Sequence, residues 1–172
     1  MAGDARSYIT NVNFFSLFPR SQRSITADCI ALGNEIAKVS LALNGFVRDV
    51  REARLDVDAI SRELHSLQGV LDLLKEDASL FPLPLAAQTP AVLDNCSKVV
   101  GALDMCFATL NSSELPRQEK RRLWAASGRK DAALFKPVIE AHRALIGIAL
   151  DLVEAYVLLL STGTGRVGKR QS

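Results

Sequence analysis

Four long stretches of the chain place apolar residues at alternating steps of three and four. This spacing lines one face of an α-helix, so each stretch predicts a helix with one buried stripe. The first stripe runs from Ile25 to Val50, the second from Ala53 to Ala78, the third from Val92 to Leu110 and the fourth from Phe135 to Leu159. No stretch shows the two-residue alternation of a strand. The sequence therefore predicts an all-α fold.

Prolines and glycines mark the expected ends of these helices. Pro82 and Pro84 predict a loop over residues 79–85, because proline lacks a backbone N–H and blocks regular helix. Thr89 followed by Pro90 places a capping hydroxyl and a preset φ angle at the expected start of the third helix. The third helix is expected to end in the loop that follows Leu110.

A short basic helix is expected between the third stripe and the fourth. Pro116 can open it, and it extends to about Ala126. Gly128 then breaks or kinks the path before the last long helix. The predicted architecture is an antiparallel bundle of four long helices plus this short basic helix, with the first two long helices forming a hairpin.

The chain divides into three parts on this interpretation. Residues 1–24 form an N-terminal extension, residues 25–160 form the bundle, and residues 161–172 read as a flexible basic tail. The extension carries an apolar cluster that predicts a short docking helix or turn on the bundle. This cluster consists of Phe14, Phe15, Leu17 and Phe18.

Residues 144–160 are the most apolar part of the chain, but Asp151 and Glu154 interrupt them. A membrane span needs about 20 apolar residues with few charges, so this stretch is interpreted as a buried helix. Its two acids are candidates for pairing with a base on a neighbouring helix. The three cysteines, Cys29, Cys96 and Cys106, fall on apolar stripes without metal-ligand spacing. They predict buried, reduced thiols in an intracellular, cytoplasmic protein.

Charge is balanced overall but unevenly distributed. The formal net charge of +2 is too small to favour a nucleic-acid partner. Residues 49–77 are rich in Asp and Glu, whereas residues 117–130 are rich in Lys and Arg. The chain therefore has one acidic element and one basic element.

Candidate enzymatic motifs are weak. Gly163 to Lys169 has the spacing of a phosphate-binding loop, but Arg170 stands where such a loop needs Ser or Thr, so a glycine-rich tail is favoured. His65 and His142 have no nucleophile or second metal ligand at a fitting distance along the chain. No catalytic residue, metal ligand or cofactor is expected.

The basic element is the candidate contact surface for a membrane or a partner. Its cations would attract anionic headgroups at roughly 1 kcal/mol each, and tryptophan favours the membrane interface. An acidic partner or RNA would suit the same residues, and a solvated face with Trp124 as a packing anchor is the alternative. The candidate residues are Arg117, Lys120, Arg121, Arg122, Trp124, Arg129 and Lys130.

Two segments resemble a known family. The stretch from Ile60 to Leu74, ISRELHSLQGVLDLL, resembles the second helix of HeLo-like domains, which precede nucleotide-binding and repeat regions in fungal STAND (NLR-type) proteins. This group includes the N-terminal domain of an azaphilone pigment cluster protein. Arg122–Trp124 followed by 136–150 is similar to the basic, Trp-containing stretch and long last helix of the same family. The likeness covers about residues 25–160.

The resemblance implies a non-enzymatic signalling or effector domain. HeLo-type relatives act in heterokaryon incompatibility and programmed cell death, and are thought to oligomerise and associate with membranes. The implied partners are a second copy of the chain, an anionic membrane surface, and downstream nucleotide-binding or repeat domains. The implied location is the cytoplasm, at times peripheral at a membrane. A protein–protein adaptor acting by self-association or by binding a partner helix stays open as the alternative.

Overall fold

The computed structural model of the chain describes residues 25–164 and contains no strand in that range. The prediction of an all-α bundle is confirmed. Its elements are α2 (Ile25–Asp49), η1 (Arg51–Ala53), α3 (Arg54–Asp77), η2 (Ala78–Leu80), α4 (Leu83–Leu110), α5 (Arg117–Leu123), η3 (Trp124–Gly128) and α6 (Arg129–Thr164).

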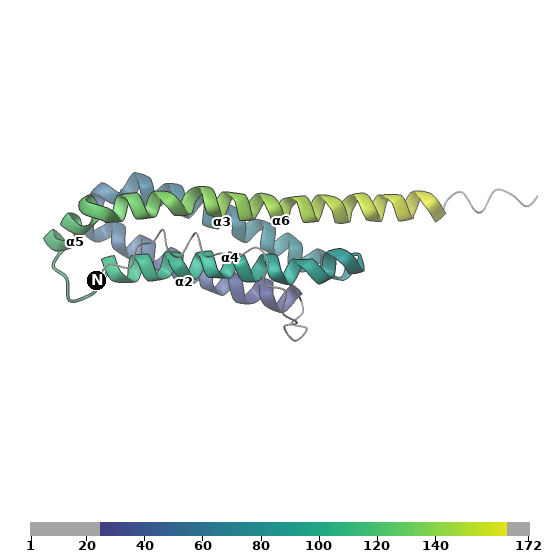
Figure 1. Ribbon diagram of the computed structural model, residues 1–172, viewed down its shortest axis with the longest axis horizontal. Coiled ribbons are helices and arrows are strands. Elements are labelled where there is room, and N and C mark those ends of the chain that lie inside the picture. The colour runs from purple at the N-terminus through teal and green to yellow at the C-terminus, as the bar shows by residue number, and fades with distance from the viewer. Residues whose placement is uncertain (1–24, 165–172) are drawn as a thin grey trace, which may run out of the picture.

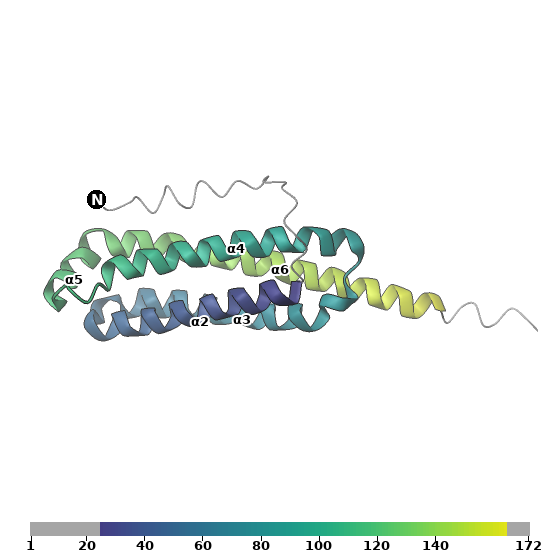
Figure 2. The same ribbon diagram turned by 90° about the horizontal axis from the view of Figure 1, so that it is seen from below.

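The four long helices form a bundle in which each packs against two neighbours (Figures 1 and 2). α2 contacts α3 and α4, and α6 contacts the same two helices, so α2 and α6 lie on one diagonal. α2 and α3 form the antiparallel hairpin that the sequence predicted. The connection from α3 to α4 crosses the other diagonal at one end of the bundle, and α5 closes the opposite end.

The first two apolar stripes are confirmed in full or nearly so. Every residue of the first predicted stripe, from Ile25 to Val50, is buried, and in the second stripe only Ala78, which lies in η2, is half-buried. The third stripe is also correct, with Val92 and Cys106 half-buried. The three cysteines are free thiols, and burial raises the pKa of Cys96 to about 12 and the pKa of Cys29 and Cys106 to about 11.

The fourth stripe is predicted correctly only at its beginning. The side chains of α6 that are buried are Ala132, Phe135, Ile139, Ile146 and Val153. Leu145, Leu152, Tyr156 and Leu159, which were assigned to the core, are exposed. The physical reason is length: the 36 residues of α6 rise about 54 Å, whereas the 24 residues of α3 and 28 of α4 rise about 36 and 42 Å. The end of α6 has no neighbouring helix to bury it.

The predicted loop over residues 79–85 is too long, and the predicted start of the third helix at Thr89 is wrong. α4 begins at Leu83, because Pro82 is its N-cap and Pro84 occupies its first turn, where a backbone N–H would have no helical partner. Pro90 lies inside the helix. The Thr89 hydroxyl donates a hydrogen bond of 2.7 Å to the Leu85 carbonyl within this turn.

The path from α5 to α6 is bent but not broken (Figure 1). α5 begins after Pro116, as predicted, and ends at Leu123. The next five residues form the π-helical turn η3, which contains Gly128. A Cβ atom at Gly128 would lie 2.9 Å from Cε3 of Trp124 and 3.1 Å from Cδ1 of Leu110, so this position has no room for a side chain.

Two predicted parts of the chain lie wholly or partly outside the described residues. The extension 1–24, with its cluster around Phe14 to Phe18, is outside. The tail predicted from 161 onward is described only to Thr164, where α6 ends, four residues beyond the expected limit of the bundle. The glycine-rich sequence Gly163–Lys169 lies mostly beyond that point.

Candidate functional site: the basic corner and the apolar end of α6

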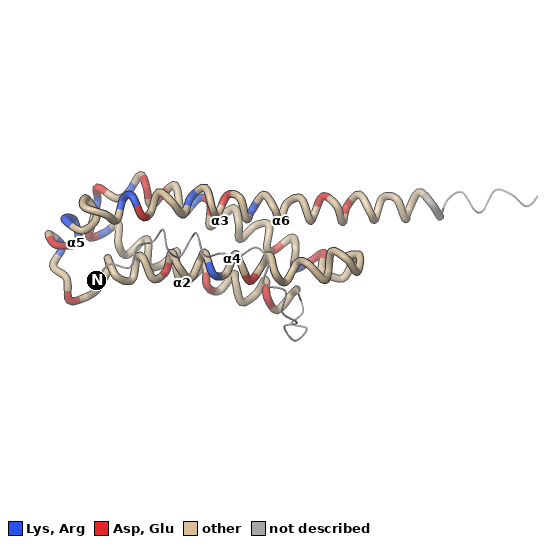
Figure 3. The backbone as a smooth tube through the Cα atoms, in the orientation of Figure 1, with Lys and Arg blue, Asp and Glu red and all other residues tan. Residues whose placement is uncertain are grey.

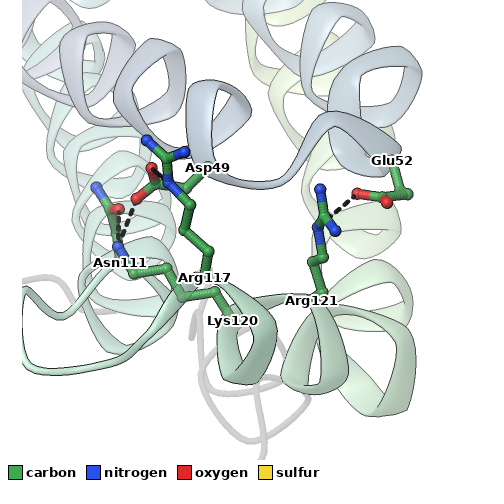
Figure 4. Close-up of polar contacts among 6 residues, drawn as sticks. All are labelled: Asp49, Glu52, Asn111, Arg117, Lys120 and Arg121. Carbon is green, nitrogen blue, oxygen red and sulfur yellow. Dashed lines mark hydrogen bonds and ion pairs between the residues drawn. The ribbon is translucent and has the colours of Figure 1, made fainter.

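The basic element lies at the corner where α5 meets the turn between α2 and α3 (Figures 3 and 4). The Lys120 ammonium donates hydrogen bonds to Asp49 Oδ2 at 2.7 Å and to Asn111 Oδ1 at 3.2 Å. Arg117 Nε donates to the other oxygen of Asp49 at 3.1 Å. Lys120 is only 5% exposed, so a single carboxylate at the end of α2 ties α5 to the bundle.

Further ion pairs link the basic element to the acidic one. Arg121 Nε lies 3.5 Å from a Glu52 carboxylate oxygen, and Arg129 Nε donates a hydrogen bond of 2.9 Å to Asp56 Oδ2. Arg122 pairs at 3.5 Å with Glu119 on its own helix. Most cations of the basic element are therefore paired with carboxylates of the same molecule.

Trp124 is a packing anchor at this corner. Its side chain is 3% exposed, and its ring lies 5.5 Å from that of Phe46 and 6.2 Å from that of Phe107, between centroids. Phe46 and Phe107 themselves meet edge to face at 5.3 Å. The indole Nε1 is buried and has no acceptor among the described residues. These three rings join α2, α4 and η3 in one aromatic cluster.

The seven candidate contact residues thus separate into two groups. Lys120 and Trp124 are buried, so neither offers a surface to a membrane or a partner in this structure. This corrects the prediction for those two residues: the same side chains that suit an anionic surface also satisfy the acidic end of α2 and the core. The exposed members are Arg117, Arg121, Arg122, Arg129 and Lys130. Among the described residues Lys130 is the one member of this group with no ion pair.

Asp49 is the electrostatic centre of the corner. The hydrogen bond from Lys120 lowers the pKa of this carboxyl below its usual value, and the positive charges of Lys120 and Arg117 act in the same direction. The carboxylate therefore stays ionised in moderately acidic solution. The corner is built to hold α5 and η3 against the α2–α3 turn rather than to perform proton transfer.

The second candidate surface is the end of α6, which projects beyond the other helices (Figures 1 and 2). Val153 is its last buried residue, and every following residue to Thr162 is exposed. The exposed apolar side chains of this region are Leu145, Ile148, Leu152, Tyr156, Val157, Leu158, Leu159 and Leu160. The prediction that residues 144–160 form a buried helix is therefore wrong.

Within this region five side chains form a stripe of their own, which we name the α6 stripe. It consists of Leu145, Ile148, Leu152, Tyr156 and Leu159. Steps of three and four keep these residues on one face, about 120° around the helix from Ile146 and Val153, which face the bundle. Asp151 and Glu154 are exposed and have no ion pair with another described residue, so the expected base on a neighbouring helix is not found.

The helical path that includes α6 is long and apolar enough to cross a membrane, the one such path in the described part of the chain. Only 11% of its most apolar 18-residue window is buried. The core helix of a soluble protein passes the same test of length and composition, but such a helix is mostly buried. The low burial of this window distinguishes the end of α6 from the core helix of a soluble protein.

A third feature is an open groove of about 410 Å³ between α2 and α3. Gly33, Gln68 and His65 are among its lining residues, and a Cβ atom at Gly33 would lie 3.0 Å from Nε2 of Gln68. His142 lies elsewhere, on α6, with Nδ1 2.8 Å from the Val138 carbonyl oxygen. Residues 25–164 contain no group of three His, Cys, Asp or Glu side chains placed to hold a metal ion.

Comparison with protein-family models, with curated proteins and with solved structures returned no match. The resemblance to HeLo-like domains therefore remains a prediction from the sequence. The exposed end of α6 could not have been found from the length of its stripe, because the fourth stripe is no longer than the first or the second, and residues 155–160 are apolar on every face.

Proposed function

We propose that this chain is a non-enzymatic helical signalling or effector domain that attaches to anionic membranes through the end of α6 and acts by oligomerisation. The observation that carries the proposal is the exposed, apolar C-terminal half of α6. Exposed apolar surface of this kind marks a contact site for a protein or a membrane.

The energy available from this surface suits weak, reversible attachment. Burying a whole leucine side chain contributes about 1.5–3 kcal/mol, and the α6 stripe residues are 38–71% exposed, which gives roughly 5 kcal/mol for the five together. This is close to the contribution of a single myristoyl chain, which binds a membrane only marginally. A second, electrostatic contribution is needed, and Arg166, Lys169 and Arg170 follow α6 in the sequence, at roughly 1 kcal/mol each.

The geometry favours a helix lying in the plane of the membrane over a helix that spans it. The 11 residues from 154 to 164 rise about 16 Å, which is half of the roughly 30 Å hydrocarbon core. A full span would need α6 to leave the bundle from about Leu145, which would expose Ile146 and Val153 and bring Asp151 into lipid at a cost of about 3 kcal/mol. If α6 lies in the plane of the membrane, the bundle stays intact.

The resemblance to HeLo-like domains supports the finer part of this proposal. It suggests a fungal immune-receptor-like protein of the STAND type, a role in programmed cell death or heterokaryon incompatibility, and a place ahead of nucleotide-binding or repeat domains. The proposed location is the cytoplasm, with peripheral association at the membrane.

Vesicle flotation with and without anionic lipid tests the proposal. We expect the chain to float with anionic vesicles, and Leu152→Ser/Leu159→Ser to reduce the bound fraction at least tenfold. The matched control is Leu41→Ser/Leu55→Ser, because these leucines are 73% and 81% exposed on α2 and α3 but lie off the α6 stripe. Equal binding by both double variants, or no binding at low salt, would contradict the proposal.

The exposed cations of the basic corner are a second arm of the same experiment. Charge reversal is restricted to Arg121 and Arg122, because reversing buried Lys120 would place two carboxylates together and disturb the fold. If the corner also faces the membrane, Arg121→Glu/Arg122→Glu lowers binding and its salt dependence. If only the end of α6 faces it, binding is unchanged.

Self-association or partner-helix binding is the second candidate function. The spacing of the α6 stripe favours it, because its steps of three, four, four and three average 3.5 residues, the period of a coiled-coil seam. Sedimentation equilibrium without lipid distinguishes the two. Dimers or larger species that dissociate in Leu152→Ser/Leu159→Ser, together with no vesicle binding, would favour the adaptor.

A further inference from the structure

The α6 stripe is an apolar face with no occupant among the described residues, and one segment of the chain is placed to cover it. α2 begins at the end of the bundle from which α6 emerges (Figure 2), and 24 residues precede Ile25 in the sequence. We propose that the apolar cluster Phe14, Phe15, Leu17 and Phe18 docks on the α6 stripe of the same molecule. This inference goes beyond the proposed function and does not depend on lipid binding.

Reach permits this docking. Phe18 is seven residues from Ile25, and an extended chain covers about 3.3 Å per residue, or about 23 Å in all. α2 and α6 lie on a diagonal of the bundle, where axes of adjacent helices are 8–10 Å apart, so the diagonal is about 14 Å. The cluster can therefore reach α6 without unwinding α2.

The surface between the two is apolar as well. The connection from α3 to α4 runs across this end of the bundle, between the beginning of α2 and α6. It presents Leu80 and Leu83, which are 48% and 87% exposed. The connection from α3 to α4 therefore adds exposed apolar surface at this end of the bundle.

Charge complementarity points in the same direction. Residues 1–24 contain three arginines against one aspartate, and Arg20 and Arg23 stand between the apolar cluster and Ile25. Asp151 follows the stripe residue Ile148 by three positions, so it lies beside the stripe on α6, and it has no ion pair with another described residue. The cations that precede Ile25 can pair with this carboxylate when the cluster docks.

The size of the stripe argues against a second copy as its occupant. Five partly exposed side chains offer roughly 500 Å² on one face, at about 100 Å² each, whereas a stable interface buries about 800 Å² per partner. A tethered segment does not face this limit, because a short linker holds it at millimolar effective concentration. The α6 stripe alone is therefore large enough for a tethered segment and too small for a stable dimer, so oligomerisation must involve further surface.

Cross-linking in the full chain, without lipid, tests the proposal. A variant carrying Ser16→Cys and Ala155→Cys places one thiol inside the apolar cluster and one beside the α6 stripe. The control carries Ser16→Cys and Ala31→Cys, since Ala31 is exposed in the second turn of α2 and equally within reach. The native thiols react slowly because burial raises their pKa to about 11 or 12.

We expect a short bismaleimide to join residues 16 and 155 within one chain at least fivefold faster than residues 16 and 31. Adding Phe14→Ser/Phe15→Ser/Phe18→Ser should bring both rates to the same value. Equal rates before that change, or rates that do not respond to it, would overturn the proposal. Cross-linked dimers in place of monomers would assign the stripe to a second copy. Vesicle binding is measured separately, so either proposal can fail alone.

Discussion

The two ends of the bundle differ in which side chains they bury: one end buries a cation and a tryptophan, and the other exposes leucines. At one end, a run of cations with a tryptophan looks like a contact surface, yet Lys120 and Trp124 are buried and Asp49 holds α5 in place. At the other end, an apolar run looks like core, yet α6 leaves the bundle and exposes Leu152 and Leu159. Composition describes what a segment can contact, and the lengths of the neighbouring helices decide what it does contact.

The difference also separates stability from function. The corner combines a three-ring aromatic cluster with a buried, hydrogen-bonded cation, and changes there should unfold the bundle. The end of α6 touches little, and changes there should leave the fold intact while altering binding. Measurements of the free energy of unfolding test this contrast.

The largest effect is expected for Trp124→Ala. Truncating a buried tryptophan leaves a cavity beside Phe46 and Phe107 and should lower the free energy of unfolding by about 3–5 kcal/mol. Urea denaturation followed by circular dichroism measures it. Trp124→Phe is the matched control: it keeps a ring and removes an indole N–H that has no acceptor among the described residues, so it should cost less. A loss below about 1 kcal/mol for the alanine variant would mean that the ring is not a packing anchor.

Lys120→Ala should follow, with a loss of about 1–3 kcal/mol. The change removes a buried ammonium, so Asn111 Oδ1 loses its donor and Asp49 keeps only the hydrogen bond from Arg117. Arg122→Ala is the control on the same helix, because Arg122 is exposed and its pair with Glu119 should contribute less than about 0.5 kcal/mol. Equal losses in the two variants would show that Lys120 is not specifically held.

A pH dependence should accompany the loss at Lys120. The pKa of Asp49 is lowered in the folded state, so its contribution is present above the unfolded value of about 3.9 and is lost as pH falls through the folded pKa. Acid denaturation below about pH 4 should therefore be steeper in the parent chain than in Asp49→Asn. Identical profiles between pH 5 and pH 2 would contradict a lowered pKa at this carboxyl.

The helices and most of their buried faces could be predicted from the sequence. Which end of the bundle is buried and which is exposed could not. The stripes from Ile25 to Val50 and from Ala53 to Leu74 were correct residue by residue, because each faces two neighbouring helices. At the end of α6, residues 155–160 are apolar all round, so periodicity cannot identify the buried face. Nor can one sequence tell that Asp49 lies beside Lys120, 71 residues away.

The start of α4 shows a further limit of local rules. Two prolines two residues apart predict a loop, but their positions relative to the helix start matter more than their spacing. Pro82 caps the helix and Pro84 lies in its first turn, so no helical hydrogen bond is lost. The boundary could be predicted only by knowing that Leu83 begins the helix.

The smallest effect on stability is expected where the proposed function is located. Contacts with the described residues alone predict that Leu152→Ser/Leu159→Ser changes the free energy of unfolding by no more than about 0.5 kcal/mol, since these side chains are 56% and 71% exposed, and docking of the apolar cluster would add to this loss. Ile146→Ala/Val153→Ala is the matched change on the buried face of the same helix and should cost several kcal/mol. Urea denaturation of the two double variants compares the faces directly. Because membrane or partner contact requires the exposed face and folding requires the other, a large loss from the serine variant would show that something covers the α6 stripe in solution. The segment around Phe14 to Phe18 would then be the first occupant to examine, and a loss independent of protein concentration would distinguish it from a second copy.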